Sequence, residues 1–316
     1  MSRSMITNDQ SSKFKTDTLY AASALTLLAA FFWGTSFPVI ELGLEIIDPF
    51  WFAQLRFLIA SLGSLVVVHL YRKRISHSLI TNPWIWCLGL FNALGFIAQF
   101  FAQTLTTATK TALLINLNLV TVAILSSLLF SEQFSKKKYI AILLSITGVF
   151  LLTTGGDISA LISGEFLGDM VALCAGFAWA FYIITNKKVV SSPKMEVIPL
   201  VACVMLTTSL FMIPFTIFFG GLEIGKINIG FSGLGFILYI GIFCNVIPFV
   251  LWTSGLKRLQ PTVSSLFMLF EVFIAAILAM LFLYESLTFV GLLGGLIIVF
   301  AIIIISMDTK NSTSNR

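Results

Sequence analysis

Ten apolar segments alternate with short polar connections along this chain. A helix needs about 20 mostly apolar residues to cross a bilayer, and long segments without polar alternation favour helices over barrel strands. The pattern predicts an all-α integral membrane protein with ten transmembrane helices. They are expected at residues 19–40, 50–70, 83–103, 108–130, 139–154, 167–186, 197–219, 230–252, 262–284 and 287–306. No connection is long enough for a soluble domain, and both polar ends are expected to be disordered tails.

The composition supports this class. Hydrophobic residues make up 58% of the chain and charged residues 10%, with a mean hydropathy of +1.01. Soluble proteins carry about 25% charged residues because their surface faces water, so a soluble globular protein is excluded. The net charge of +5 does not indicate nucleic-acid binding, because the basic residues form short clusters between apolar segments. The four cysteines lie in apolar segments without metal-ligand spacing and are expected to be buried.

Basic residues lie almost entirely in alternate connections and at the two ends, which together carry 16 of the 19 Lys and Arg residues. They are Arg3, Lys13, Lys15, Arg72, Lys73, Arg74, Lys136, Lys137, Lys138, Lys187, Lys188, Lys194, Lys257, Arg258, Lys310 and Arg316. The other connections carry only Lys110 and Lys226. Because Lys and Arg favour cytoplasmic loops, the tails 1–18 and 307–316 are both predicted to be cytoplasmic. A bacterial inner membrane is the expected location.

The two halves of the chain carry similar features in the same order. Glu132 follows the fourth segment and Glu285 follows the ninth, 153 residues later, while Trp33 in the first segment corresponds to Trp179 in the sixth. We therefore predict two five-helix repeats. They cover residues 19–154 and 155–306. Because five is odd, the second repeat starts from the opposite face of the membrane, and such inverted repeats are typical of secondary transporters.

Two polar residues correspond to each other in this register. Asn118 is the repeat mate of Glu271, and each lies about 15 Å from the end of its segment at a rise of about 1.5 Å per residue. Ionised carboxyl groups are costly in hydrocarbon, so a carboxylate in the middle of a span normally faces a bundle interior or a wet cavity. The pair Asn118 and Glu271 is therefore the expected centre of a binding site.

Six short motifs follow one another along residues 20–306. They are Trp33–Phe37, Leu55–Phe57, Leu128–Phe134, Gly148–Leu152, Glu271–Ala275 and Glu285–Thr288. Together they resemble the drug/metabolite transporter superfamily, and in particular its ten-span EamA type. The resemblance implies a secondary carrier of small metabolites, often an exporter, with both termini in the cytoplasm. The family commonly has a proline after the Glu271 position, where this chain has Val272, and often one near Leu119, so the resemblance leaves open whether these helices are distorted.

Glu271 and Arg56 are the two charged residues that lie away from the ends of the predicted spans, and each has two interpretations. Glu271 either faces a cavity and couples substrate to proton movement, or forms a structural ion pair with Arg56. Arg56 either binds an anionic substrate such as a carboxylate through its planar guanidinium, or pairs with Glu271 or reaches toward the headgroups. The sequence does not decide between them.

Other polar and aromatic residues inside spans are further candidates. Asn92, Phe96, Gln99 and Gln103 share one face of the third span, which indicates either a wet stripe along a path or hydrogen bonds between helices. In the eighth span, Asn245 precedes Pro248, which is expected to kink the helix and is a candidate hinge. Trp33, Trp179 and Tyr182 either line a cavity or pack in the core.

These features favour a secondary transporter that moves a small organic metabolite, such as an amino acid or related solute, by alternating access. Proton coupling through Glu271 is one option. The expected partners are a small-molecule substrate, protons and membrane lipids, without nucleic acid. No cofactor or metal is expected, because no nucleotide-binding or metal motif is present. The alternative is an intramembrane enzyme that uses Glu271 as a general base on a lipid-like substrate, although no nearby nucleophile or metal cluster supports it.

Overall fold

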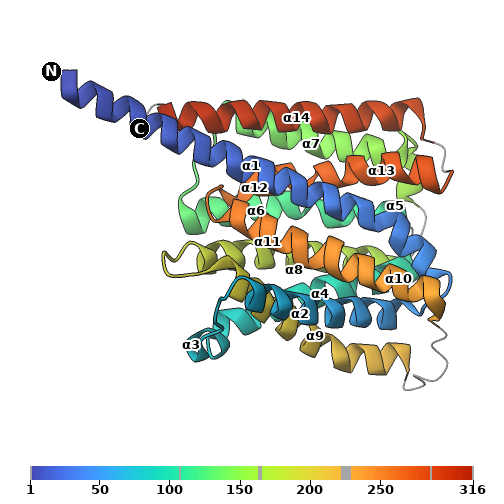
Figure 1. Ribbon diagram of the computed structural model, residues 1–316. Helices are drawn as coiled ribbons and strands as arrows, with labels where there is room; N and C mark the ends of the chain where they lie inside the picture. Colours follow the sequence, from blue (N-terminus) through green and yellow to red (C-terminus); the bar gives the residue numbers. More distant parts are fainter. Residues whose placement is uncertain (1, 107, 163–165, 222–228, 285–286, 315–316) are drawn as a thin grey trace.

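The computed structural model describes residues 2–106, 108–162, 166–221, 229–284 and 287–314, and every regular element within these ranges is helical (Figure 1). Ten helices or helix pairs in this part of the chain are long and apolar enough to cross a membrane. They cover Asp17–Leu44, Pro49–Leu70, Pro83–Ala102, Thr111–Phe130, Lys136–Thr154, Phe166–Val190, Val197–Gly220, Gly230–Leu256, Pro261–Phe282 and Phe289–Asp308. The predicted number and order of spans are therefore confirmed.

Seven spans are formed by continuous helices, and the fourth, eighth and ninth are interrupted. The continuous ones are α1 (Ser2–Leu44), α2 (Pro49–Leu70), α4 (Pro83–Leu105), α7 (Lys136–Thr154), α8 (Phe166–Val190), α9 (Val197–Gly220) and α14 (Phe289–Ser314). The interrupted spans are α5 (Ala108–Asn116) with α6 (Asn118–Phe130), α10 (Gly230–Gly241) with η3 (Ile242–Val246) and α11 (Ile247–Leu256), and α12 (Pro261–Met268) with α13 (Phe270–Phe282). Two short elements, α3 (His77–Ile80) and η1 (Ile158–Leu161), lie in connections.

Polar residues in the connections set where the spans begin. The Asp48 carboxylate accepts hydrogen bonds from the backbone N–H groups of Phe50 and Trp51, and Pro49 supplies the first residue of α2. Asn82 caps α4 in the same way, and Ser135 caps α7 through the backbone N–H of Lys138. These caps satisfy backbone donors that would otherwise remain unpaired at the helix ends.

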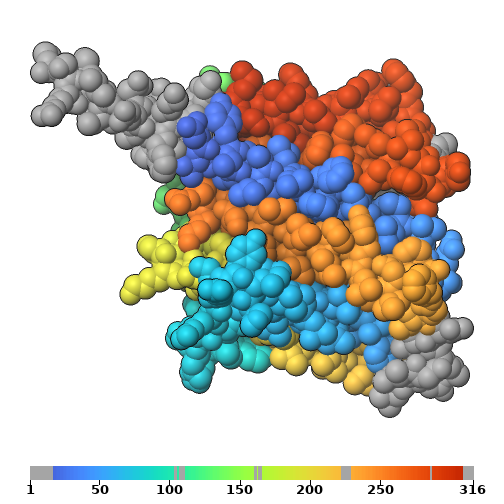
Figure 2. Space-filling model, viewed as in Figure 1, coloured from blue at the N-terminus to red at the C-terminus, as the bar shows by residue number. Residues whose placement is uncertain are grey.

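Glycine allows two spans from different halves to approach closely. A Cβ atom placed on Gly148 of α7 would lie 2.8 Å from the carbonyl oxygen of Gly294 on α14, and one on Gly294 would lie 2.4 Å from the backbone nitrogen of Leu152. No side chain fits at either position without separating the two helices. On the face that Figure 2 shows, α1 crosses the bundle between α14 and the α10–α11 segment.

Both chain ends lie at the same end of the bundle (Figure 1). We call this end the basic end, because contacts there join the Lys- and Arg-bearing connections. Lys73 forms an ion pair with Glu196 at 3.2 Å, and the Lys257 ammonium donates to the carbonyl of Met195. At the opposite end, the Trp51 indole N–H donates to the carbonyl of Gly220. An even number of spans returns the chain to the side on which it started. The position of both chain ends at one end of the bundle therefore agrees with the predicted topology.

The eighth span is interrupted one turn before the predicted kink. A π-helical turn occupies Ile242–Val246, and Pro248 lies in the first turn of α11, where its missing N–H costs no hydrogen bond. Cys203 and Cys244 are buried as expected, whereas Cys87 is only half-buried and Cys174 is exposed on α8. The expectation that all four cysteines are buried was therefore wrong for Cys174, because apolar composition does not distinguish a lipid-facing position from a core position.

Candidate functional site

The fourth and ninth spans are both broken close to their middle. Backbone N–H groups at the breaks bond three residues back, from Leu117 to Leu114 and from Leu269 to Leu266, instead of the four-residue spacing of an α-helix. The breaks are 152 residues apart, and neither contains proline. The sequence left open whether the fourth and ninth spans are distorted. Both are interrupted, at positions that correspond within a residue in the two halves.

The breaks place Asn118 and Glu271 at helix starts. Asn118 is the first residue of α6, and Glu271 lies in the first turn of α13. A helix N-terminus carries unpaired N–H groups and a partial positive charge, which favours a carboxylate there. The close approach of α1 holds this turn in place, because a Cβ on Gly34 would lie 2.9 Å from the carbonyl oxygen of Glu271. The local backbone therefore explains how a mid-span carboxylate is tolerated.

A small pocket lies where the two breaks meet. Its wall includes Leu117 from the first break and Leu269 from the second. Ser145 of α7 contributes a buried hydroxyl that has no hydrogen-bond partner among the described residues. The pocket is lined by residues of both halves of the chain, and its size suits a single water molecule that could bond to the Ser145 hydroxyl.

The two parts of the ninth span differ in exposure. Residues Pro261–Phe267 of α12, at the basic end, are all buried. Every residue of α13 from 271 to 279 is half-buried, and none is fully buried. In the fourth span, positions 112–116 of α5, also toward the opposite end, are likewise all half-buried. The bundle is thus packed tightly around the ninth span at the basic end and loosely around it at the other end.

Arg56 of α2 is buried against aromatic rings. Its guanidinium carbon lies 4.1 Å from the ring centre of Phe96, 5.1 Å from that of Phe57 and 5.9 Å from that of Phe100. Within the described part of the chain, Arg56 forms no ion pair with Glu271 or any other acid. Its Nε and Nη2 atoms also have no hydrogen-bond partner there.

A chain of touching rings runs from Arg56 through the centre of the bundle. We call it the aromatic column; it consists of Phe57, Phe96, Trp179, Tyr182, Trp252, Phe249 and Trp33. The steps include Phe96 to Trp179 at 4.7 Å between ring centres and Tyr182 to Trp252 at 5.8 Å. The column joins α1, α2, α4, α8 and α11, so it connects both halves of the chain. Sequence analysis left Trp33, Trp179 and Tyr182 between cavity wall and core, and the structure brings all three into this one column.

Three carboxamides near the column are buried and only partly satisfied. Asn92 donates to the Thr208 hydroxyl at 3.0 Å, and Asn186 donates to that of Thr253 at 3.4 Å. The Oδ1 atoms of both, and the Nδ2 atom of Asn245, have no partner among the described residues. Buried polar groups normally have partners, so these atoms are available to a bound solute or water. Gln99 is half-buried, and the side chain of Gln103 lies outside the described residues.

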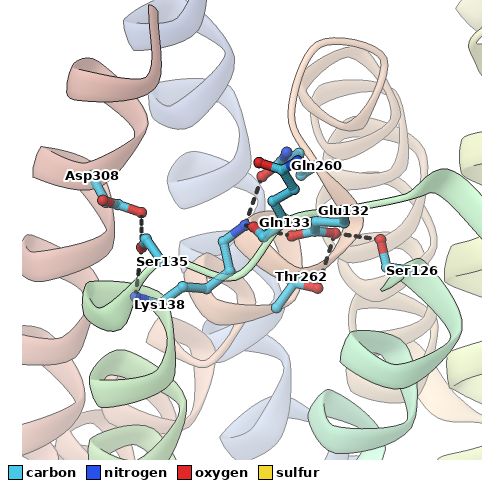
Figure 3. A network of polar contacts seen from close by, with 8 residues as sticks. All are labelled: Ser126, Glu132, Gln133, Ser135, Lys138, Gln260, Thr262 and Asp308. Carbon is cyan, nitrogen blue, oxygen red and sulfur yellow. Dashed lines mark hydrogen bonds and ion pairs between the residues drawn. The ribbon is translucent and has the colours of Figure 1, made fainter. Parts of the chain in front are cut away.

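A polar network closes the basic end between the two halves (Figure 3). The Lys138 ammonium donates to Glu132 Oε1 at 2.9 Å, to the carbonyl of Gln133 at 2.8 Å and to Gln260 Oε1 at 2.9 Å. Glu132 Oε2 accepts hydrogen bonds from Thr262 at 3.0 Å and from Ser126. We call these residues the basic-end network. It fastens the connection between α6 and α7 to the start of α12.

Comparison with known proteins identifies the family. The EamA-like transporter family matches this chain twice, at residues 21–154 and 166–307. The chain belongs to the EamA-like transporter family. It is 30% identical over 277 residues to an uncharacterized transporter of Archaeoglobus fulgidus, covering 87% of this chain and 92% of that protein. It is 29% identical over 284 residues to a Salmonella typhimurium protein named probable amino-acid metabolite efflux pump, covering 87% and 91%.

A solved crystal structure shares the fold. It has a TM-score of 0.76 and 17% identity, and the match covers 90% of this EamA-like chain and 96% of the other. This likeness concerns the fold alone. The family and its named relatives are transporters, so this chain is a transporter and the alternative of an intramembrane enzyme is set aside.

The structure of this EamA-like transporter separates residues that the sequence placed together. Arg56, Trp33, Trp179 and Tyr182 lie in or beside the aromatic column, whereas Glu271 lies on α13, which packs mainly against α1. Asn118 begins α6 beside the pocket at the breaks. The ion pair of Arg56 with Glu271 does not form, because α2 directs Arg56 toward the rings of α4.

Sequence reasoning missed the basic-end network. It treated Lys138 as a loop charge and Glu132 as the end of a span, and the structure buries both side chains almost completely. A signal was present, because Ser135 is a strong N-cap residue between an acid and a base six residues apart. The contacts to Gln260 and Thr262, more than 120 residues away, had no sequence signal. Glu285, the predicted mate of Glu132, lies outside the described residues.

Proposed function

We propose that this transporter is a secondary active exporter of a small organic metabolite, such as an amino acid or related solute, working by alternating access. One observation carries the proposal: the ninth span is fully buried at the basic end and half-exposed at the opposite end, with a helix break between. A carrier whose two ends differ in this way holds one end closed while the other is accessible. The aromatic column and its unpartnered polar atoms form the proposed substrate site, together with Asn118 and Glu271.

An inverted repeat would explain how the protein exchanges the closed end of the bundle for the open one. The family match covers each half separately, and each half contains five spans. Two similar five-span units that begin on opposite faces exchange their conformations when the carrier turns over. In the second conformation, the region around α5 would pack tightly and the region around α12 would loosen. The basic-end network is the contact that must break for this exchange.

Counterflow in proteoliposomes tests the transport proposal. Vesicles containing the full-length protein are loaded with one unlabelled metabolite, and uptake of the labelled form is followed with and without a pH gradient. Exchange of at least one solute above that of protein-free vesicles is expected. If a panel of amino acids and related solutes gives no exchange in either direction, the proposal is wrong.

Proton coupling is proposed to run through Glu271. Glu271 is a half-buried residue at the start of α13, where the helix N-terminus favours an ionised carboxylate and the surrounding apolar residues favour the neutral acid. A bound solute that shifts the Glu271 carboxyl group from one form to the other would therefore cause a proton to be taken up or released. Glu271→Gln is expected to abolish stimulation by a pH gradient while counterflow persists. Glu45→Gln, at an exposed acid beyond the first span, is the control. Unchanged pH stimulation in the Glu271 variant would rule coupling out.

The orientation remains a proposal that the charge pattern supports. Both termini are proposed to lie in the cytoplasm of a bacterium, with the basic end at the cytoplasmic face of the inner membrane. Fusion of a reporter that fluoresces only in the cytoplasm to either terminus should give fluorescent cells. A reporter active only outside the inner membrane should be silent at both positions.

A further inference from the structure

Arg56 is a buried cation without a counter-charge. Its side chain is 4% exposed, and no acid within the described residues forms an ion pair with it. Placing a charge in a low-dielectric interior is costly unless the charge is paired. Glu271, the acidic residue near the middle of a span, lies on α13, whereas the Arg56 guanidinium packs against Phe96 of α4. The protein therefore retains a cation whose partner is not supplied by the described chain.

The unpartnered atoms of Arg56 lie on one edge of the guanidinium. Nε and Nη2 are the two atoms without a hydrogen-bond partner, and their N–H bonds project side by side from the same edge of the planar group. A carboxylate fits this edge with two parallel hydrogen bonds. Phe96 covers the guanidinium with its ring at 4.1 Å. The ring covers one face of the group, and the Nε–Nη2 edge is buried without an acceptor, so an in-plane acceptor would complete it.

The π-helical turn that packs against α2 contains a further unpaired donor. Gly241, the residue before this turn, approaches the backbone of Arg56, since a Cβ there would lie 3.1 Å from the Arg56 carbonyl oxygen. Asn245 in the same turn is 2% exposed, and its Nδ2 atom has no partner among the described residues. A π-turn inside an α-helix often marks a functional site, since it redirects side chains. Two elements from different halves thus present unpaired donors, which together favour an anion.

The aromatic column defines what the rest of the ligand must be. Phe96 contacts both the Arg56 guanidinium and the indole ring of Trp179, at 4.7 Å between ring centres. The surroundings of the Arg56 guanidinium are therefore aromatic, and such surroundings favour a ligand with an apolar or aromatic body.

We propose that the Nε–Nη2 edge of Arg56, with Asn245, binds the carboxylate of the transported solute, and that this solute is a monocarboxylate with an apolar or aromatic body. This assignment rests on the transport function proposed above. It gives Arg56 its missing counter-charge only while substrate is bound, so the empty site favours anions over neutral and cationic analogues.

Matched acids and amides test the assignment. Binding of 3-phenylpropionate, L-phenylalanine and L-leucine to the full-length protein in detergent and a carboxylate-free buffer is measured by tryptophan fluorescence and calorimetry. Each is compared with its amide, which lacks the negative charge but keeps the body. At least one acid is expected to bind more tightly than its amide by about 10- to 100-fold, the range for hydrogen bonds to a charged group.

Variants of Arg56 identify the residue responsible. Arg56→Gln is expected to remove the preference for the acid and to leave binding of the amide unchanged. Arg56→Lys keeps the charge without the planar fork, so an intermediate preference is expected. Lys194→Gln, at an exposed connection residue, is the charge-matched control and should behave as the wild type. All variants are first checked for a single monodisperse species.

The outcomes separate this inference from the transport proposal. If no acid binds the wild type, if amides bind as tightly, or if Arg56→Gln keeps the preference for the acid, the assignment is wrong. If counterflow occurs with a non-carboxylate and is unaffected in Arg56→Gln, the protein is a transporter but Arg56 is not its anion site. If acids bind through Arg56 and no solute exchanges, the site stands and the transport proposal fails.

Discussion

Lys138 and Arg56 are both buried basic side chains, and they differ in what surrounds them. They are 3% and 4% exposed, so both have lost their hydration to a similar extent. The Lys138 ammonium has three acceptors, one of them the Glu132 carboxylate, whereas the Nε and Nη2 atoms of Arg56 have none among the described residues. Burial alone therefore does not distinguish a structural charge from a binding group. The two are distinguished by whether the N–H donors of the buried cation have acceptors.

The largest difference between the two cations is expected in the free energy of unfolding, when each is replaced by an apolar residue of similar length. Lys138→Met should lower the free energy of unfolding by about 3–5 kcal/mol, because it leaves the Glu132 carboxylate buried without its counter-charge. Arg56→Met should be neutral or stabilising, because it removes a charge that had no partner. Unfolding in mixed micelles of increasing sodium dodecyl sulfate content measures both. Equal destabilisation by the two substitutions would contradict the comparison.

A ligand should stabilise the protein through Arg56 and not through Lys138. At a 3-phenylpropionate concentration of 100 times its dissociation constant, the free energy of unfolding should rise by about 2.7 kcal/mol. The same concentration should give a much smaller rise in Arg56→Gln. In Thr262→Val, whose network is weakened but whose Arg56 is intact, the rise should equal that of the wild type. A rise that persists in Arg56→Gln would place the acid elsewhere.

A smaller effect is expected from one hydrogen bond of the basic-end network. Thr262→Val keeps the shape of the side chain and removes the donor to the Glu132 carboxylate, so the free energy of unfolding should fall by about 1.5 kcal/mol. Thr153→Val is the matched control, because the Thr153 hydroxyl bonds only within its own helix, to the carbonyls of Val149 and Phe150. No difference between the two variants would show that the contact between α12 and Glu132 adds nothing to stability.

The smallest effects should come from the rings beside the two cations. Phe134 lies 5.0 Å from the Lys138 ammonium, and Phe134→Leu should cost only about 0.5 kcal/mol of cation–π stabilisation, since three acceptors remain. Phe96→Leu should in contrast weaken binding of 3-phenylpropionate several-fold, because this ring orients the Arg56 edge. Calorimetric titration of both variants checks the contrast. An unchanged affinity in Phe96→Leu would show that the ring does not position the guanidinium.

The two ends of the bundle also differ in the contacts that hold them together. The basic end is held by charged and hydrogen-bonded contacts between the halves, whereas α13 at the other end is half-exposed along most of its length. In the 153-residue register, Lys138 corresponds to Gly291, so the second half has no basic residue at the matching position. The two conformations of an inverted repeat would thus be stabilised by different chemistry.

Sequence reasoning reached the architecture because lipid imposes strong local rules. Ten spans and the family follow from apolar segment length and motif order. The same reasoning did not find the helix break at Leu269, because no proline marks it. It also offered Glu271 as a partner for Arg56, since counting along helices gives depth but not the direction in which a side chain points.

The sequence by itself determined that this chain crosses a membrane ten times, belongs to a transporter family and carries the charged residues Arg56 and Glu271 away from the ends of its spans. These properties depend on composition and order along the chain, and each span satisfies its own backbone hydrogen bonds. Only the tertiary structure decided that Lys138 is satisfied by Gln260, while Arg56 faces the ring of Phe96. Whether a buried charge has a partner depends on groups brought together from distant parts of the chain, so it appears only once the helices are packed.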